Sequence, residues 1–251
     1  DYLRVSITDR CNLRCIYCMP AEGVVLKPRE ELLSFEEICR VVSAARSIGF
    51  KKFRITGGEP LVVRDVLRLL EDIALAADGA TLALTTNGLR LFEMAAAIRQ
   101  AGVTRLNLSL DTLNRERFIA LTRRDGLLDV LKALDRAIEV GFTKVKINAV
   151  IVRGQNEAEL VPLAMLAKDR RIEVRFIERM PLENSRDEGF LGAAEILQRL
   201  RRVLDLEQLP PEDPRQAAQL MYRSPQLLGQ VGVIAPRSQK FNMFRHAGAL
   251  N

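Results

Sequence analysis

Short apolar or β-branched runs alternate along the chain with longer segments in which apolar residues recur at helical spacing. The short runs predict buried strands, and the longer segments predict amphipathic helices. We predict strands at Leu3–Thr8, Lys52–Thr56, Thr81–Thr86, Arg105–Ser109, Lys144–Ile151 and Glu173–Ile177. We predict helices near residues 35–48, 62–76, 90–101, 127–141, 156–169 and 192–204.

Local signals at the helix ends agree with this pattern. Ser34-Phe-Glu-Glu37 forms a capping box at the start of the first helix, and Gly49, Gly102 and Gly141 each follow a periodic segment. Six β–α repeats in this order predict an α/β fold with a parallel sheet and right-handed crossovers. A chain of 251 residues suits one barrel or half-barrel, whose active site lies at the carboxyl ends of the strands.

The β–α pattern breaks after about residue 205. Pro210-Pro211-Glu-Asp-Pro214 predicts a loop, and only Gly232-Val-Ile234 suggests another strand. We therefore predict a main domain over residues 1–205 and an appendage over residues 206–251 that covers the open edge or mouth of the sheet.

The net charge of +6 and the pI of about 9.4 favour an anionic partner. No long Lys/Arg run and no basic stripe with interleaved aromatics is present, so we expect no nucleic acid as partner. No basic segment followed by an apolar one and no apolar stretch near 18 residues is present, so we expect neither a signal peptide nor membrane association. Three of the four cysteines lie within eight residues, which is unlike a disulfide framework and favours the cytoplasm.

Cys11, Cys15 and Cys18 follow the first predicted strand with C-x3-C-x2-C spacing. Three thiolates on one loop can bind three irons of a [4Fe–4S] cluster and leave the fourth iron open to a small molecule. The alternatives are a structural zinc site and three ordinary buried cysteines. Structural zinc requires four protein ligands, and the only histidine is His246. Cys39 occupies an apolar position within a helix and is interpreted as a core residue.

Three further motifs end predicted strands. In Thr56-Gly57-Gly58-Glu59-Pro60 the glycines allow a ligand to approach the backbone, and Glu59 offers an acceptor to an ammonium group. Thr85-Thr-Asn-Gly88 and Asn107-Leu-Ser-Leu-Asp111 place small hydroxyl side chains at the same edge. A plain turn, or a local hydrogen bond that caps a helix, is the alternative for each.

Arg4, Arg54, Lys146 and Arg175 are cations inside strand-like segments. Strand cations commonly point outward at an edge, with an apolar stem and a solvated head. Alternatively, these four converge on a polyanion inside the barrel, for which a triphosphate is the simplest candidate.

The cysteine spacing, with Tyr17 in the aromatic slot of C-x3-C-x-(aromatic)-C, resembles the radical S-adenosylmethionine (SAM) superfamily. The resemblance implies that the open iron binds the methionine part of SAM, which is cleaved to methionine and a 5′-deoxyadenosyl radical. It implies that the GGEP motif, with Gly58 and Glu59, receives the methionine amino group, that Thr85 and Ser109 contact SAM, and that Met180 lies beside the adenine.

A wider resemblance, over roughly residues 1–205, is to the GTP 3′,8-cyclase family of molybdenum cofactor biosynthesis. It rests on Leu3-Arg-Val-Ser-Ile-Thr-Asp-Arg-Cys-Asn-Leu-Arg-Cys15, Cys18-Met-Pro20, Arg54-Ile-Thr-Gly-Gly-Glu-Pro-Leu61 and Arg175-Phe-Ile-Glu178. It implies an incomplete (βα)6 TIM-like barrel and an enzyme, a lyase, that abstracts the C3′ hydrogen of GTP and joins C3′ to guanine C8. Arg4, Arg54, Lys146 and Arg175 would then hold the nucleotide. An electron donor such as flavodoxin or ferredoxin is implied, and a homodimer is compatible.

The sequence departs from this family toward its C-terminus. The family carries a second [4Fe–4S] cluster whose segment begins Phe-Cys-x2-Cys-Asn. The corresponding stretch here is Phe241-Asn-Met-Phe-Arg-His246, and no cysteine follows Cys39, so residues 206–251 are incomplete relative to the family. Two other interpretations therefore stay open: another radical SAM enzyme with a different anionic substrate, and a non-catalytic nucleotide-binding paralogue.

Overall fold

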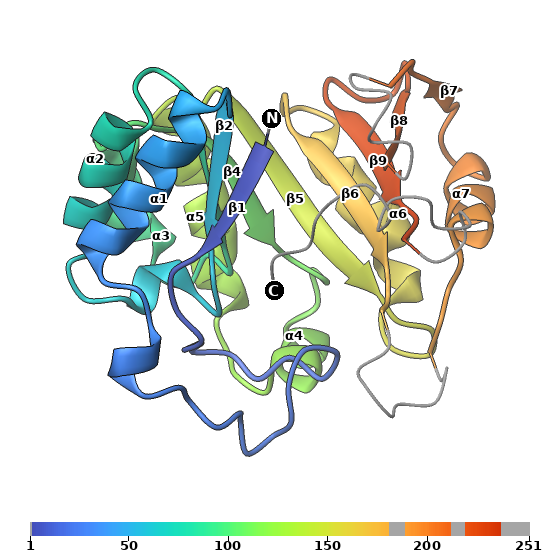
Figure 1. The fold of residues 1–251 in the computed structure, drawn as a ribbon. Helices are drawn as coiled ribbons and strands as arrows, with labels where there is room; N and C mark the ends of the chain where they lie inside the picture. The colour runs from blue at the N-terminus through green and yellow to red at the C-terminus, as the bar shows by residue number, and fades with distance from the viewer. Residues whose placement is uncertain (1, 181–188, 212–218, 237–251) are drawn as a thin grey trace. The chain divides into compact units, whose positions relative to one another are not determined.

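The computed structural model describes residues 2–180, 189–211 and 219–236 (Figure 1). The chain forms two compact units, which we describe one at a time. The first consists of Asp1–Ser109 and Thr122–Val145, and the second of Leu110–Leu121 and Lys146–Asn251. This division differs from the boundary expected between residues 205 and 206, which stays a prediction.

The first unit is built on four parallel strands in the order in which they occur in the sequence. They are β1 (Tyr2–Ser6), β2 (Lys52–Thr56), β3 (Thr81–Thr86) and β4 (Val103–Ser109). Within β2, the fully buried Phe53 and Ile55 alternate with the partly exposed Arg54 and Thr56. Because successive side chains point to opposite faces, one face of this sheet is apolar and the other polar.

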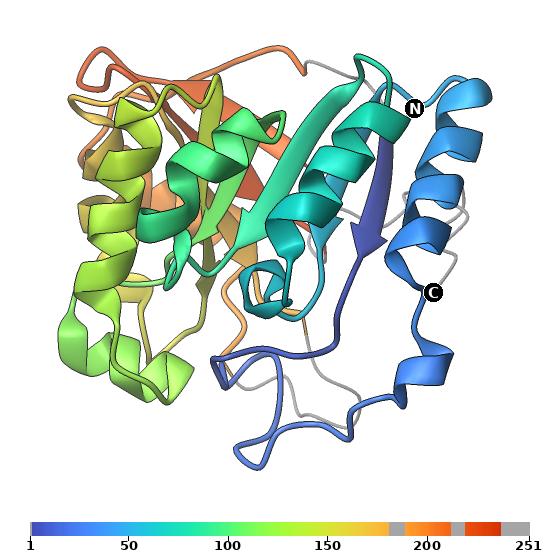
Figure 2. The ribbon, with the colours of Figure 1, turned by 90° about the vertical axis from the view of Figure 1, so that its left-hand side faces the viewer.

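Helices cover the apolar face of this sheet, as both ribbon views show (Figures 1 and 2). They are α1 (Phe35–Ser47), α2 (Val66–Ala76), α3 (Leu91–Gln100) and α5 (Leu127–Glu139). The short turns η1 (Arg29–Glu31) and η2 (Pro60–Val62) lie in the connections that lead to α1 and α2. The predicted capping box is present, because Glu37 N donates to Ser34 Oγ at 3.2 Å and Ser34 N to Glu37 Oε2 at 2.8 Å. Buried apolar residues of the helices, such as Val42, Leu69 and Leu134, form the core against the strands.

The second unit contains the remaining strands: β5 (Lys144–Ile151, whose first two residues belong to the first unit), β6 (Glu173–Glu178), β7 (Glu207–Gln208), β8 (Gln219–Arg223) and β9 (Gln230–Ile234). Strands β5, β6 and β9 are parallel neighbours, and β8 and β7 continue antiparallel from β9. The helical segments are α4 (Arg115–Thr122), η3 (Glu157–Glu159), α6 (Leu160–Ala164), η4 (Met165–Ala167) and α7 (Ala193–Arg201). Together the units give the expected α/β class with a mixed sheet.

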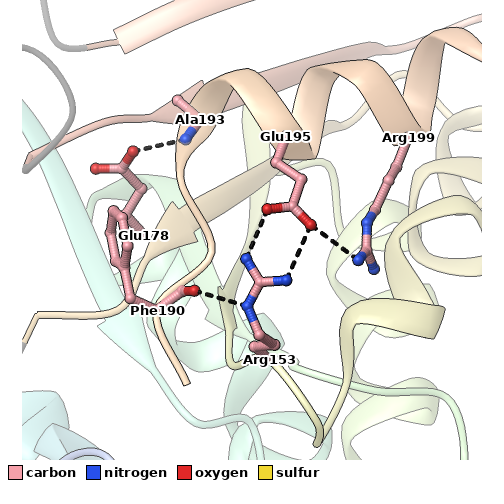
Figure 3. A network of polar contacts seen from close by, with 6 residues as sticks. All are labelled: Arg153, Glu178, Phe190, Ala193, Glu195 and Arg199. Atoms are coloured by element: carbon pink, nitrogen blue, oxygen red, sulfur yellow. Dashed lines mark hydrogen bonds and ion pairs between the residues drawn. The ribbon is translucent and has the colours of Figure 1, made fainter. Parts of the chain in front are cut away.

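A polar network fixes the start of α7 in the second unit (Figure 3). The guanidinium of Arg153 donates to both carboxylate oxygens of Glu195, at 3.1 and 2.6 Å, and to the Phe190 carbonyl oxygen at 3.1 Å. The buried Glu178 carboxylate accepts a hydrogen bond from Ala193 N at 2.7 Å and so caps the first turn of the helix. None of the described helices has the length and apolar character needed to cross a membrane.

Candidate functional site

The cysteine loop, residues 9–19, follows β1 at its carboxyl end. Cys18 N and Met19 N both donate to the Cys15 carbonyl oxygen, at 2.9 and 3.1 Å, which closes a tight turn between the second and third cysteines. Cys11 and Cys15 are partly exposed and Cys18 is exposed, and none of the chain's cysteines is in a disulfide. The structure thus brings the three predicted ligands onto one short loop with accessible thiols.

Arginine side chains hold the outside of this loop by donating to its carbonyl oxygens. Arg14 Nη1 donates to Cys11 O at 2.7 Å and to Leu13 O at 2.9 Å. Arg124 Nη1 donates to Asn12 O at 3.1 Å, and Arg123 Nη1 to Arg14 O at 2.8 Å. These charge-assisted bonds fix the backbone, and Arg14 also adds positive charge beside the Cys11 thiol.

Burial raises the pKa of the Cys11 thiol, and the Glu59 carboxylate raises it further. The Leu13 N–H, the Asn87 amide and the Arg14 charge act in the opposite direction. Burial is also the main cause of the raised pKa of Cys18, with Cys11 as a second cause. A bound metal would reverse this tendency, because a coordinating thiol is deprotonated.

The donor set of the loop fits a [4Fe–4S] cluster. Cys11 Sγ already accepts hydrogen bonds from Leu13 N at 3.4 Å and from Asn87 Nδ2 at 3.9 Å, the kind of contact that tunes cluster thiolates. Among the described residues, no three His, Cys, Asp or Glu side chains are placed to hold a single metal ion. Thiolates of a cubane differ from such a set, because each binds its own iron.

The two glycines of the GGEP motif lie against the backbone that leads into the cysteine loop. Gly58 N donates to Thr8 O at 2.6 Å, and Glu59 N donates to Arg10 O at 2.7 Å. A Cβ atom on Gly57 would lie 2.6 Å from Thr8 O, and one on Gly58 would lie 2.2 Å from Arg10 O. The glycines are therefore required by this contact within the chain, whereas their approach to a ligand stays a prediction.

Glu59 is 1 % exposed, and its carboxylate joins two strand-end segments. Oε1 accepts hydrogen bonds from Leu61 N at 3.0 Å and Thr86 Oγ1 at 2.7 Å, and Oε2 accepts one from Asn87 N at 2.6 Å. Burial raises the pKa of Glu59, while these donors oppose the rise. The expectation that Glu59 accepts from an ammonium group is untested, and donors of the chain itself already occupy both oxygens.

The other residues expected to contact SAM lie at strand ends or in the loop. Thr85 and Ser109 are partly exposed near the ends of β3 and β4, and Thr85 Oγ1 accepts a hydrogen bond from Asn107 Nδ2 at 3.2 Å. Tyr17 is partly exposed beside Cys18. Met180 follows β6 in the second unit and is 52 % exposed.

Arg4 and Arg54 are register partners on the polar face of the first unit. The Arg54 guanidinium lies 4.9 Å from the Tyr2 ring centroid, and its buried Nε has no hydrogen-bond partner. Burial lowers the pKa of Arg54, Tyr2 opposes this change and Arg4 adds to it. Ala83 is the register partner of both Arg54 and Arg105, so Arg4, Arg54 and Arg105 form one row of cations across the strands, the cation row. Of the described residues, none forms a hydrogen bond or an ion pair with Arg4 or Arg105.

The two expected cations of the second unit are buried and have acidic or amide partners. Lys146 Nζ lies 2.6 Å from Glu173 Oε2, and both side chains are at most 10 % exposed. Arg175 is 3 % exposed and donates to Asn148 Oδ1 from Nε at 3.0 Å and from Nη2 at 2.7 Å. Arg175 is thus turned inward and not toward solvent.

Sequence reasoning did not assign roles to Asn87, Asn12 or Arg105. Asn87 Nδ2 donates to Asn12 Oδ1 at 2.7 Å as well as to Cys11 Sγ. An asparagine that follows a strand and precedes a glycine is typical of a turn. The sequence pattern therefore does not indicate that the Asn87 side chain also donates to the cysteine loop. The alternation along β4 could have identified Arg105 as a cation on the same face as Asn107.

Comparison with known proteins places the chain in a family. Residues 5–167 match the Radical SAM superfamily. The GTP 3′,8-cyclase of Desulforamulus reducens is 42 % identical over 244 residues, which are 96 % of this chain and 75 % of the relative. That of Ectopseudomonas mendocina is 43 % identical over 246 residues, 96 % of this chain and 73 % of the relative.

Solved structures agree on the fold. Methylornithine synthase aligns with a TM-score of 0.64 and 20 % identity, over 80 % of this chain and 61 % of that chain. Streptococcus suis SuiB aligns with a TM-score of 0.61 and 22 % identity, over 80 % of this chain but only 45 % of that chain. The fold is therefore the radical SAM fold, and at the identities given above the chain belongs to the GTP 3′,8-cyclase family of the radical SAM superfamily.

Proposed function

We propose that this chain is a GTP 3′,8-cyclase that uses a [4Fe–4S] cluster and SAM in molybdenum cofactor biosynthesis. The observation that carries the proposal is its 42 % identity, over 96 % of its length, to a curated protein of that name. The cysteine loop and the cation row on the first sheet supply the chemistry that such an enzyme needs. When bound, the cluster and SAM supply the one-electron chemistry that starts hydrogen abstraction.

Cys11, Cys15 and Cys18 would hold the cluster. Their loop is fixed from one side by the carbonyl contacts of Arg14, and Gly58 packs against the residues that precede Cys11. Such a fixed loop can present thiolates without a large rearrangement, which preserves the geometry needed for a bound substrate to react. Gly58, Glu59, Thr85, Ser109, Met180 and Tyr17 are the residues we propose to bind or flank SAM.

Arg4 and Arg54 would bind the anionic part of GTP. Neither has an acidic partner among the described residues, and the buried Nε of Arg54 is an unused donor. A buried unsatisfied donor is costly, and a phosphate oxygen would satisfy it with a charge-assisted bond. Lys146 and Arg175 are the proposed contributions of the second unit, where Glu173 and Asn148 hold them before any ligand binds.

We further propose a cytoplasmic setting and a small redox protein, such as flavodoxin or ferredoxin, as the electron donor. Besides the three cysteines of the loop, the sequence contains only Cys39, on α1. Because these cysteines can hold one [4Fe–4S] cluster, we expect about four irons per chain. The segment expected to align with the family's second cluster, Phe241–His246, lies outside the described residues.

The decisive experiment uses anaerobically reconstituted protein, reductant, SAM and GTP carrying deuterium at C3′. We expect release of 5′-deoxyadenosine that contains deuterium, together with a product in which C3′ is joined to C8. Release of 5′-deoxyadenosine without deuterium would favour a different substrate. Failure to release any, despite a full complement of iron, would reject the proposed chemistry in favour of a binding-only protein.

A further inference from the structure

The amide side chain of Asn87 lies between the cysteine loop and the end of β3. Its Nδ2 donates to Cys11 Sγ at 3.9 Å and to Asn12 Oδ1 at 2.7 Å, and its Oδ1 accepts from Leu89 N at 3.1 Å. The amide is 8 % exposed, so water competes little for these contacts. The Asn87 side chain is therefore a donor to the sulfur of one of the three predicted cluster ligands.

The Glu59 carboxylate fixes the position of Asn87. Oε2 accepts from the backbone N–H of Asn87 at 2.6 Å, while Oε1 accepts from Thr86 Oγ1 and Leu61 N. The N–H of Glu59 itself donates to Arg10 O, one residue before Cys11. A single buried residue therefore contacts the backbone on both sides of the site: the lead into the cysteine loop and the Asn87 turn.

We propose that Glu59 is a positioning residue, which holds the Asn87 amide against the sulfur of Cys11 and so sets the reduction potential of the cluster. This inference rests only on the cluster part of the proposed function and needs neither GTP nor its cyclisation. It differs from the expected role of Glu59 as an acceptor for the methionine ammonium group.

The direction of the effect follows from charge. Reduction adds negative charge to the cluster and its thiolates, and an N–H donor on a sulfur stabilises the more negative state. Loss of the Asn87 amide should therefore make the potential more negative. Glu59→Gln has two opposed effects. An amide cannot offer acceptors to all three donors, which loosens the Asn87 turn, but the change also removes a negative charge near Cys11, and that favours the reduced cluster. The direction is therefore tested with Thr86→Val, which removes one donor to the carboxylate and keeps its charge.

The test is a redox titration of the reconstituted cluster without SAM, followed by electron paramagnetic resonance of its reduced form. The variants are Asn87→Ala, Asn87→Asp, Glu59→Gln and the double variant Glu59→Gln/Asn87→Ala. We expect the two Asn87 variants to hold wild-type iron, to shift to a more negative potential and to change the resonance g-values. Glu59→Gln should hold wild-type iron and change the g-values. The double variant should shift no further than Asn87→Ala alone, because both changes remove one shared contact.

Asn156→Ala is the matched control. Asn156 is also a buried amide with three hydrogen bonds, to Asp111 O, Val150 O and Val152 N, but it belongs to the second unit. It should lower thermal stability and leave the potential unchanged. Thr86→Val tests the same carboxylate without changing its charge, since it removes the donor to Oε1; a shift to a more negative potential is expected.

Two results would overturn the inference. One is an unchanged potential and spectrum in both Asn87 variants. The other is a Thr86→Val protein with wild-type potential and spectrum. If Glu59→Gln weakens the SAM affinity and leaves the spectrum unchanged, Glu59 is a ligand of the ammonium group. Wild-type protein that takes up no iron would instead reject the proposed function, and the two failures are thus distinguishable.

Discussion

Gly58 and Arg10 lie backbone against backbone, with no room between them for a side chain. An ideal Cβ atom on Gly58 would lie 2.2 Å from the Arg10 carbonyl oxygen and 2.9 Å from that of Asp9. Since Arg10 immediately precedes Cys11, the GGEP motif and the cysteine loop form one structural piece. This relationship explains why a glycine-rich segment accompanies the cysteines even before any ligand is considered.

Gly58→Ala should therefore disturb the cysteine loop. The methyl group can be accommodated only by backbone movement, which typically costs about 1–3 kcal/mol. We expect lower stability in urea unfolding and a reduced iron content after reconstitution. Gly49→Ala is the control, because Gly49 has a φ of 101° but nothing within 4 Å of its Cβ position. It should lose some stability through backbone strain and keep full iron content.

Cys15→Ser should abolish cluster binding and SAM cleavage, whereas Cys39→Ser should retain most of both. Cys15 belongs to the turn closed by Cys18 N, while Cys39 lies on α1, outside the loop. Iron and sulfide content together with 5′-deoxyadenosine release measure the outcome. Equal losses in the two variants would contradict the ligand assignment.

Much of the fold was predictable from the sequence, because strand runs and helix-ending glycines are local signals. Strands β2, β3 and β5 have the predicted bounds, and Gly49, Gly102 and Gly141 all adopt positive φ. Helix α4 was missed, since it is short and carries few buried apolar residues. The helix expected over residues 156–169 is three short pieces instead, within a stretch that includes Pro162, which lacks a backbone donor.

The candidate site was only partly predictable, because its partners come from distant parts of the sequence. The cysteine spacing is local and could be read directly. In contrast, the donors that engage Glu59 include Thr86 and Asn87, which are 27 and 28 residues away. Similarly, the ion pair of Lys146 with Glu173 follows from the register of β5 and β6, which the pattern of hydrophobic residues does not specify.

Arg54→Ala should weaken GTP binding about tenfold or more, since a hydrogen bond to a charged group contributes about 1.5–3 kcal/mol. Its iron content should match that of the wild type, because the described contacts of Arg54 are with Tyr2 and Arg4 on β1, outside the cysteine loop. Isothermal titration calorimetry with GTP provides the affinity. Arg68→Ala on α2, a solvent-exposed arginine paired with Asp72, is the control and should bind GTP normally.

Glu173→Gln should lower the stability of the apoprotein by about 3–5 kcal/mol, because it leaves the buried Lys146 ammonium without its carboxylate. If Lys146 binds a phosphate group, GTP should restore part of this loss. We therefore expect GTP to raise the melting temperature of the variant more than that of the wild type. An equal increase in both proteins would argue against Lys146 as a nucleotide ligand.

The Arg153–Glu195 pair provides a pH-dependent prediction that is independent of any ligand. Hydrogen bonds from Arg153 are the main cause of the lowered pKa of Glu195, with Arg199 contributing in the same direction. The folded protein therefore binds a proton at Glu195 less readily than the unfolded chain does. The pair stabilises the fold above the ordinary glutamate pKa of 4.5, and this stabilisation is lost as the pH falls through the lower pKa of the folded state.

Glu195→Gln should accordingly be less stable than the wild type at pH 7. The margin should be small because the pair is solvent-exposed, and it should shrink below pH 4.5. Urea unfolding of the variant and the wild type at a series of pH values measures it. A difference that stayed constant with pH would mean that Glu195 acts through packing and not through its charge.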